Sequence, residues 1–418
     1  MPRFVLRHLP LSDIPNIAGY YGLMMLFSTG FVAGNWIFFW TRFMTYGQLG
    51  VVDAVMFAFG LLMEVPTGAV ADSIGGRRTL IVACALCFAG TLIVTLSVSF
   101  AMLIGGFAVL LTGFAFFSGA AEALAYDTLK ARDQAAQFDR VQSSAAALGM
   151  VVAFVTTLAG GALYVLQWRL PHLAWSVGFL LAVVVAWRLS EPPVQRPGFS
   201  WGAYRRQLGR GFGQLWGPRL RPFLALILLL SAVEVLYTAG LISPAMAVSF
   251  GFFADAQAVI WAVALLAAAG AISTLPRWRR HLSDMNGLAL LAALGGGGFL
   301  LAATQPGPAL GVVILVGLMA VARMGLPWIS VVVNHRIPSE ARSTTLSTVA
   351  LLAQIPYAAT AWAAGAMVES GTFWIFNLAV GALLVGTMLV SWLAYHLTGE
   401  HARQTAYTEA ALLQGADD

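Results

Sequence analysis

Residues 64–78 read EVPTGAVADSIGGRR and stand between two apolar runs, each long enough to form a helix. The polar part of this stretch is one carboxylate, two glycines and two arginines: Asp72, Gly75, Gly76, Arg77 and Arg78. So short a polar segment cannot carry the chain far from a lipid surface. The stretch is therefore predicted to be the tight turn of a hydrophobic hairpin.

Composition identifies the class of protein. Of the 418 residues, 59% are hydrophobic and 10% are charged, with 43 glycines and 13 tryptophans. A soluble domain carries about a quarter charged residues, so this chain has too few charges to cover a soluble surface. Glycine suits close helix packing and tryptophan suits interfacial anchoring. We predict a polytopic membrane protein.

Apolar runs of about 20 residues, the length that crosses a bilayer as a helix, occur twelve times in two sets of six. The first set covers 16–41, 49–71, 79–98, 100–127, 142–166 and 171–189. The second covers 222–248, 255–275, 286–304, 308–334, 345–367 and 373–396. They predict an all-α membrane protein with an N-terminal bundle at 1–189, a linker at 190–221, a C-terminal bundle at 222–396 and a tail at 397–418. The first residues lack a cleavable signal peptide, so the first span is expected to direct insertion.

The placement of the basic residues predicts the orientation. With the N-terminus inside, the outer loops hold only Arg42 and Arg169, and nearly all other cations fall in inner segments. By the positive-inside rule, both termini are expected to be cytoplasmic. The net charge of +5 is therefore a topology signal, and nucleic acid is not expected as a partner.

The linker at 190–221 alternates aromatic residues with arginines and holds a single acid, Glu191. It is predicted to be a basic amphipathic helix on the anionic inner leaflet, with a regulatory or partner-binding helix as the alternative. Cys84 and Cys87 lie inside an apolar run, which predicts buried thiols instead of a redox pair.

The pattern from Gly68 through Asp72 and Gly75 to Arg77 resembles the signature loop of the major facilitator superfamily of secondary transporters, Gly-x-x-x-Asp-Arg-x-Gly-Arg-Arg/Lys. Ser73 and Gly76 replace two of its basic residues. The segments 64–68, 118–129 and 334–347 look like one bacterial branch of that family. The resemblance implies two six-helix bundles that work by alternating access in the inner membrane, with this loop as a conformational latch.

The latch has a physical rationale. Gly68 would allow close helix approach, and Asp72 could pair with Arg77 or lie at a neighbouring helix N-terminus. A topogenic loop alone would explain Arg77 and Arg78 but not the glycine and aspartate spacing. Three departures weaken a drug-antiporter assignment: the fourth span has no arginine, the fifth has Gly160-Gly161 without Gly-Pro, and Thr274 stands where the counterpart loop at 275–285 would have an aspartate.

Ionisable residues at membrane depth are costly and therefore informative. Glu234 and Arg323 enter from opposite sides and fall near the same depth, so a pair or a shared water network is predicted. Its function is either coupling or simply holding the second bundle together. In the first bundle the candidates are Glu122, Asp127 and Glu64, and Glu122 is the better one for protonation.

Substrate contacts are predicted from polar and aromatic residues within spans: Asn35, Trp36, Tyr237, Trp328, Gln354 and Tyr357. The alternative for each is helix packing. Such a lining suits an amphipathic organic molecule better than a bare ion.

We therefore expect a monomeric secondary transporter of a small organic solute, with protonation of Glu234, Glu122 or Glu64 as a candidate energy source. Export is favoured, and a siderophore or nutrient uptake permease is the alternative. An intramembrane enzyme or a non-transporting receptor is less favoured. No cofactor or metal is expected, and no nucleotide-binding GxxxxGK[ST] loop is present.

Overall fold

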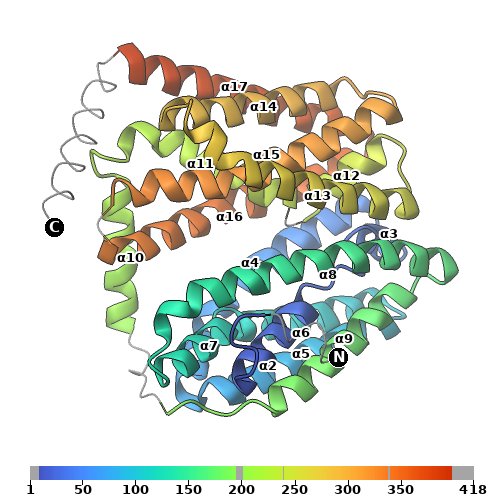
Figure 1. The fold of residues 1–418 in the computed structure, drawn as a ribbon. Coiled ribbons are helices and arrows are strands. Elements are labelled where there is room, and N and C mark those ends of the chain that lie inside the picture. Colours follow the sequence, from blue (N-terminus) through green and yellow to red (C-terminus); the bar gives the residue numbers. More distant parts are fainter. Residues whose placement is uncertain (1–8, 194–200, 239, 338, 398–418) are drawn as a thin grey trace, which may run out of the picture. The chain divides into compact units, whose positions relative to one another are not determined.

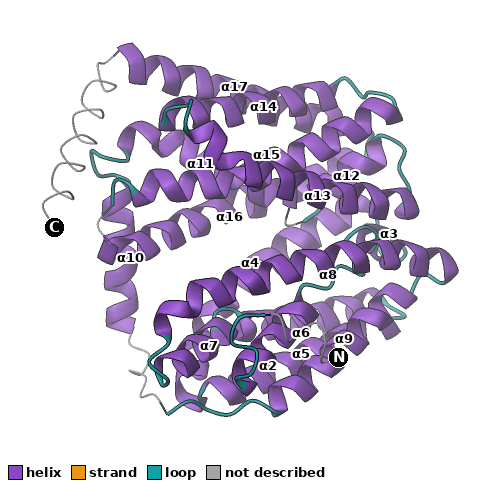
Figure 2. Cartoon of the chain, in the orientation of Figure 1, coloured by secondary structure: helices purple, strands orange, loops and turns teal. Residues whose placement is uncertain are grey.

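The computed structural model describes residues 9–193, 201–238, 240–337 and 339–397. All regular structure in this part of the chain is helical, and Figure 2 shows helices and loops without a strand among the residues it colours. Eleven of the described helices are long and apolar enough to cross a membrane. The predicted all-α membrane fold is confirmed.

The chain divides into two compact units. Unit 1 comprises Met1–Thr45, Val52–Ser200 and Phe253–Ala262, and unit 2 comprises Tyr46–Val51, Trp201–Phe252 and Val263–Asp418. The α-helices up to residue 193, labelled in Figure 1, are α2 (Pro15–Phe27), α3 (Trp36–Trp40), α4 (Tyr46–Ile74), α5 (Gly76–Leu96), α6 (Phe100–Phe117), α7 (Ala120–Lys130), α8 (Phe138–Leu166) and α9 (Leu170–Trp187). The short 3-10 helix η1 (Ala135–Gln137) lies between α7 and α8 in the chain.

The later helices are α10 (Trp201–Leu215), η2 (Arg221–Phe223), α11 (Leu224–Thr238), α12 (Ile242–Ser249), α13 (Ala254–Arg279), α14 (Asp284–Ala303), α15 (Pro308–Asn334), α16 (Ser339–Glu369) and α17 (Phe373–Leu397). The first six residues of α4 belong to unit 2, and the first nine of α13 belong to unit 1.

Three spans predicted as continuous helices are interrupted. The span at 16–41 is α2 and α3 with residues 28–35 between them, and the span at 222–248 is α11 and α12. The span at 100–127 divides into α6 and α7 where Gly119 has φ of 71°. Hydropathy counts apolar length and does not register these breaks, so the sequence predicted the spans but not their division into shorter helices.

The break in the first span is built by small residues. Residues 28–35 read STGFVAGN, and the backbone N–H of Gly30 donates to Oγ1 of Thr156 on α8 at 2.7 Å. A Cβ at Gly160 would overlap the carbonyl of Phe31. A non-helical segment at membrane depth must be satisfied by neighbouring protein groups. Thr156 and Gly160 provide the hydrogen bond and the space.

The break in the seventh span follows the same rule. The backbone N–H of Leu241, between α11 and α12, donates to the hydroxyl of Tyr357 on α16 at 2.8 Å. Tyr357 is fully buried. Its hydroxyl therefore replaces a helical carbonyl as the acceptor for this backbone group.

Within unit 1, α5 packs closely on α6 and α9. A Cβ at Gly90 would meet the backbone of Leu110 in α6, and a Cβ at Gly113 would meet Cys87 in α5. Cys84 and Cys87 are both buried and unbonded to each other, as predicted. Lipid provides no hydrophobic driving force for helix association, so these helices are held together by the close packing that small residues allow.

Within unit 2, α14 lies along α17 in Figure 1, with Gly296 and Gly381 at their crossing. The linker contains the predicted helix as α10, and a Cβ at its Gly211 would overlap Thr348 of α16. The linker helix therefore packs on protein through this face.

We predict that Gly160→Ala destabilises the fold, because the added Cβ meets a backbone carbonyl that cannot yield. Overpacking of this kind costs about 1–3 kcal/mol of unfolding free energy. Gly105→Ala in α6 is the matched control, because a Cβ there meets nothing within 4 Å. Thermal unfolding of the purified proteins measures both, and equal melting temperatures would contradict the packing described.

Candidate functional site

The signature stretch forms the predicted tight turn. α4 ends at Ile74 and α5 begins at Gly76, so Gly75 alone connects them. Its φ of 87° lies in the left-handed region that glycine adopts without strain. Arg78 is exposed.

Glu191 occupies the N-terminus of α5. Its Oε1 accepts the backbone N–H of Gly76 at 2.8 Å, and its Oε2 accepts that of Arg77 at 2.7 Å. A carboxylate here satisfies two free helix donors and faces the positive end of the helix dipole. The side chain of Arg77 donates to the carbonyl of Trp187 at 2.8 Å. The side chain of Asp72, the predicted partner of this turn, lies outside the described residues.

Two expectations for α4 stay predictions. A Cβ at Gly68 would meet nothing within 4 Å, so no close helix approach at this glycine is seen within unit 1. Glu64 is exposed and forms no ion pair with the fourth span among the described residues.

Asn16 joins three elements of unit 1 next to Glu191. Its amide donates to Oγ1 of Thr128 on α7 and to the carbonyl of Ser190, each at 2.9 Å. Its Oδ1 accepts the backbone N–H of Ser190 at 2.9 Å. Segment 190–191 is thereby held against α2, α7 and the start of α5. Sequence reasoning missed this node, although Glu191 stood out as the single acid of the linker.

The predicted Glu234–Arg323 pair is present in unit 2. Nη1 of Arg323 on α15 lies 3.2 Å from Oε1 of Glu234 on α11. Thr238, one turn later, donates its hydroxyl to the same oxygen at 3.1 Å. Oε2 of Glu234 has no hydrogen bond among the described residues, so the pair is a single contact and not a bidentate one.

The surroundings of this pair are unequal. The Glu234 side chain is 10% exposed and that of Arg323 is 40% exposed. Arg323 lies near the middle of α15, and charged side chains at that depth in membrane proteins generally face the bundle interior or water instead of lipid. Glu234 also lies one turn before the break that ends α11. These features place an acid, a cation and an interrupted helix together.

Three predicted substrate contacts are fully buried. The hydroxyl of Tyr237 donates to the carbonyl of Leu315 at 2.8 Å. The hydroxyl of Tyr357 accepts the backbone N–H of Leu241, as described above. Nε1 of Trp328 donates to the carbonyl of Asp284 at 3.4 Å. Each polar atom is thus bound to backbone, which favours the packing alternative. Gln354 is half-buried.

In unit 1 the predicted residues lie on different elements. Glu122 is in the first turn of α7, and its Oε2 is buried without a hydrogen bond to any described residue. The buried hydroxyl of Tyr20 on α2 also has no hydrogen bond within the described part of the chain. Asp127 lies on the same helix and is half-buried. Asn35 donates to the carbonyl of Phe31 at 2.9 Å, and Trp36 packs edge-on against Trp40.

A second ionic cluster lies at the start of α14. Asp284 accepts from Nη2 of Arg279 at 2.8 Å and from Nη1 of Arg336 at 2.5 Å. The guanidinium of Arg336 also lies 4.2 Å from the ring centroid of Phe223. By the spacing of the first loop, an aspartate is expected at position 274, where the sequence has Thr274. The acid of this second loop is Asp284, ten residues later in the sequence.

Comparison with known proteins identifies the family. The model of the Major Facilitator Superfamily matches residues 14–361. The chain belongs to the major facilitator superfamily. As a member it is a multi-pass secondary transporter and not an enzyme.

Solved structures of this superfamily share the fold. The nucleoside transporter NupG is similar with a TM-score of 0.67 at 15% identity, covering 93% of this chain and 99% of that one. The D-xylose-proton symporter is similar with a TM-score of 0.65 at 16% identity, covering 91% and 97%. A bacterial homologue of the lysosomal transporter Spinster gives 0.67 at 15%, covering 92% and 96%. No curated protein is similar in sequence.

We predict that Glu191→Ala destabilises this superfamily member by about 1–2 kcal/mol, the usual cost of losing a helix cap. Glu191→Gln retains an acceptor but loses the charge, so it is expected to fall between the alanine variant and the wild type. Thermal unfolding measures the series. If Glu191→Ala melts like the wild type, the cap does not support the turn.

Proposed function

We propose that this transporter exchanges protons for a small amphipathic organic solute across the cytoplasmic membrane, and that Glu234 carries the proton. The observation that carries the proposal is the single, partly exposed contact between Glu234 and Arg323 beside the break in α11. A carboxylate that gains and loses a proton needs an oxygen that is not already engaged in hydrogen bonds. Glu234 meets this condition, because only its Oε1 has partners among the described residues.

The chemistry follows from the two charge states of Glu234. Ionised Glu234 attracts Arg323, and protonation removes that attraction. A solute that carries a cation or a donor competes with the proton for the same carboxylate. Linkage makes such competition reciprocal, because the proton and the solute each weaken binding of the other. An inward proton gradient would then drive the solute outward, which favours export.

Uptake is the alternative, and one observation supports it. Nε of Arg323 is buried and unbonded, so the guanidinium has unused donor capacity. A solute with an acidic group could bind Arg323 when Glu234 is protonated, which would move proton and solute in the same direction. One structural neighbour is a D-xylose-proton symporter, so this fold supports proton symport in that protein.

The signature loop remains a proposed conformational latch, comprising Gly68, Asp72, Gly75, Arg77 and Arg78. Glu191 is added to it, because its carboxylate holds the turn at Gly76 and Arg77. Substrate contact by Trp36 and Gln354 likewise remains a proposal, as do the anionic lipids at the linker and a monomeric state.

We predict that Glu234→Gln removes the dependence of transport on a pH gradient. The amide keeps the shape of the side chain but cannot exchange a proton. Proteoliposomes are assayed for uptake and efflux over a panel of amphipathic cations, acids and sugars, with and without the gradient. The control is Asp139→Asn, which neutralises an exposed acid in the first turn of α8. Transport that responds to the gradient equally in wild type and Glu234→Gln would refute coupling through Glu234.

We predict that Arg323→Ala lowers transport by about tenfold or more, equivalent to about 1.4 kcal/mol. In the Arg323→Ala background, Glu234→Gln should lower transport less than it does in the wild type, because the effects of two residues in contact are not additive. Transport is normalised to folded protein measured by size-exclusion chromatography. If activity per folded molecule is unchanged in Arg323→Ala, the pair only holds unit 2 together.

A further inference from the structure

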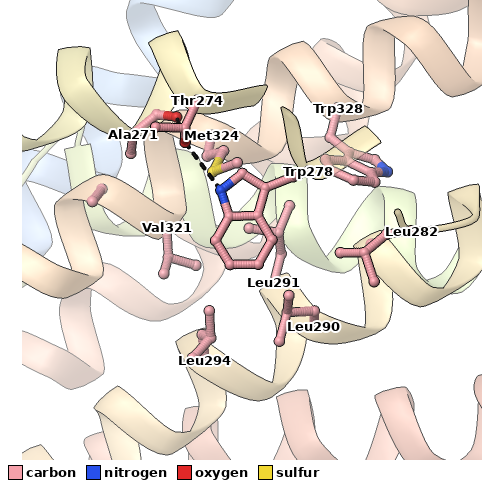
Figure 3. Close-up of a pocket in the computed structure, with 12 residues that line it drawn as sticks. Ala271, Thr274, Trp278, Leu282, Leu290, Leu291, Leu294, Val321, Met324 and Trp328 are labelled. Carbon is pink, nitrogen blue, oxygen red and sulfur yellow. Dashed lines mark hydrogen bonds between the residues drawn. The ribbon is translucent and has the colours of Figure 1, made fainter. Parts of the chain in front are cut away.

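A crevice in unit 2, whose lining includes neither Glu234 nor Arg323, has no part in the proposed transport cycle. It lies between α13, α14 and α15 and has a volume of about 210 Å³. Figure 3 shows the indole of Trp278 from α13 projecting into it, with Leu290 and Leu294 of α14 and Val321 of α15 around the ring. Trp278 and Leu294 are 47% and 53% exposed, so the crevice is open along one side.

The lining lacks the polar groups that would recognise an organic solute. Nε1 of Trp278 donates to Oγ1 of Thr274 at 3.0 Å, the dashed line in Figure 3. Nε1 of Trp328 is bonded to backbone, and the other lining side chains are apolar. An apolar cavity of about 150 Å³ holds a molecule such as benzene. This crevice therefore has room for a segment of hydrocarbon chain.

The length and position of the crevice match one leaflet. It runs from Ala271 past Trp278 on α13 to Leu282, three residues beyond the end of α13 at Arg279. The nine residues of helix from Ala271 to Arg279 span about 13 Å, close to the half-thickness of a hydrocarbon core of about 30 Å. On the predicted topology, the α13–α14 turn is cytoplasmic. The crevice then occupies the inner leaflet, with Trp278 at the interface, where tryptophan is favoured.

Two exposed arginines are near Trp278 in the sequence. Arg277 precedes it directly and Arg280 follows it by two residues, and both are exposed. Neither forms an ion pair with another described residue, whereas Arg279 between them is bound to Asp284. Cations at the membrane surface attract the anionic headgroups of the inner leaflet.

We propose that this crevice is a binding site for an anionic phospholipid of the inner leaflet. One acyl chain lies between Trp278, Leu294 and Val321, and the phosphate is bound by Arg277 and Arg280. The site is separate from the Glu234–Arg323 pair, so its existence does not depend on proton coupling.

The full chain in phosphatidylcholine nanodiscs, doped with phosphatidylglycerol bearing a diazirine on one acyl chain, tests the proposal. After irradiation, labelled peptides are mapped by mass spectrometry. Labelling is expected within 287–294 and 320–328, and the same diazirine on phosphatidylcholine is expected to label these segments weakly. Arg277→Ala with Arg280→Ala should reduce phosphatidylglycerol labelling at least about fivefold. Ala271→Phe, which fills the crevice, should abolish it.

The matched control is Lys130→Ala with Arg132→Ala, which removes two exposed cations from unit 1 and should leave labelling unchanged. Because Arg277 and Arg280 are exposed, their replacement leaves a testable protein even if Ala271→Phe fails to fold. Equal labelling by both lipids, labelling insensitive to the arginines, or displacement of the probe by a transported solute would each overturn the proposal.

Discussion

Hydrocarbon offers no hydrogen bonds, so every interruption of a spanning helix must be satisfied by the protein itself. Both units contain such interruptions, and the structure shows how they are satisfied. The Thr156 hydroxyl serves the backbone of Gly30 in unit 1, and the Tyr357 hydroxyl serves the backbone of Leu241 in unit 2. Once these bonds fix the breaks, the adjoining side chains have defined positions. Glu234 lies one turn before the second of these breaks, beside Arg323.

The three ionic sites differ in how completely they are satisfied. Glu191 uses both carboxylate oxygens on the backbone of α5, and Asp284 uses both on two arginines at the start of α14. These two helices are the third spans of their respective predicted sets, so each set anchors the same helix with an acid. Glu234 bonds through one oxygen only. Glu191 and Asp284, whose two carboxylate oxygens are both bonded, fit a structural role. Glu234, which has one bonded oxygen, fits a role in proton exchange.

Sequence patterns predicted the parts of this protein that depend on local composition. The helical hairpin at Gly75, the buried thiols of Cys84 and Cys87, and the superfamily all follow from short-range patterns. The Glu234–Arg323 contact was also predictable, because the cost of burying a charge requires a partner at the same depth.

Other features depend on contacts between distant residues and were missed. Glu191 caps α5 from 115 residues away, and Asn16 binds Ser190 from 174 residues away. The breaks in the first and seventh spans were missed because a hydropathy window averages over a few non-helical residues. Substrate contact by Tyr237, Trp328 and Tyr357 stays a prediction, because aromatic residues in a span have the same sequence signature whether they pack or bind.

The assignment of the coupling proton to Glu234 is tested most directly by infrared difference spectroscopy of the reconstituted protein across a pH titration. The carboxylic acid C=O stretch reports a proton on a glutamate directly, without a transport assay. A protonated-carboxyl band should appear as the pH falls, shift when a transported solute is added, and vanish in Glu234→Gln. A band that persists unchanged in Glu234→Gln, or no titrating carboxyl band in the wild type, would contradict the assignment.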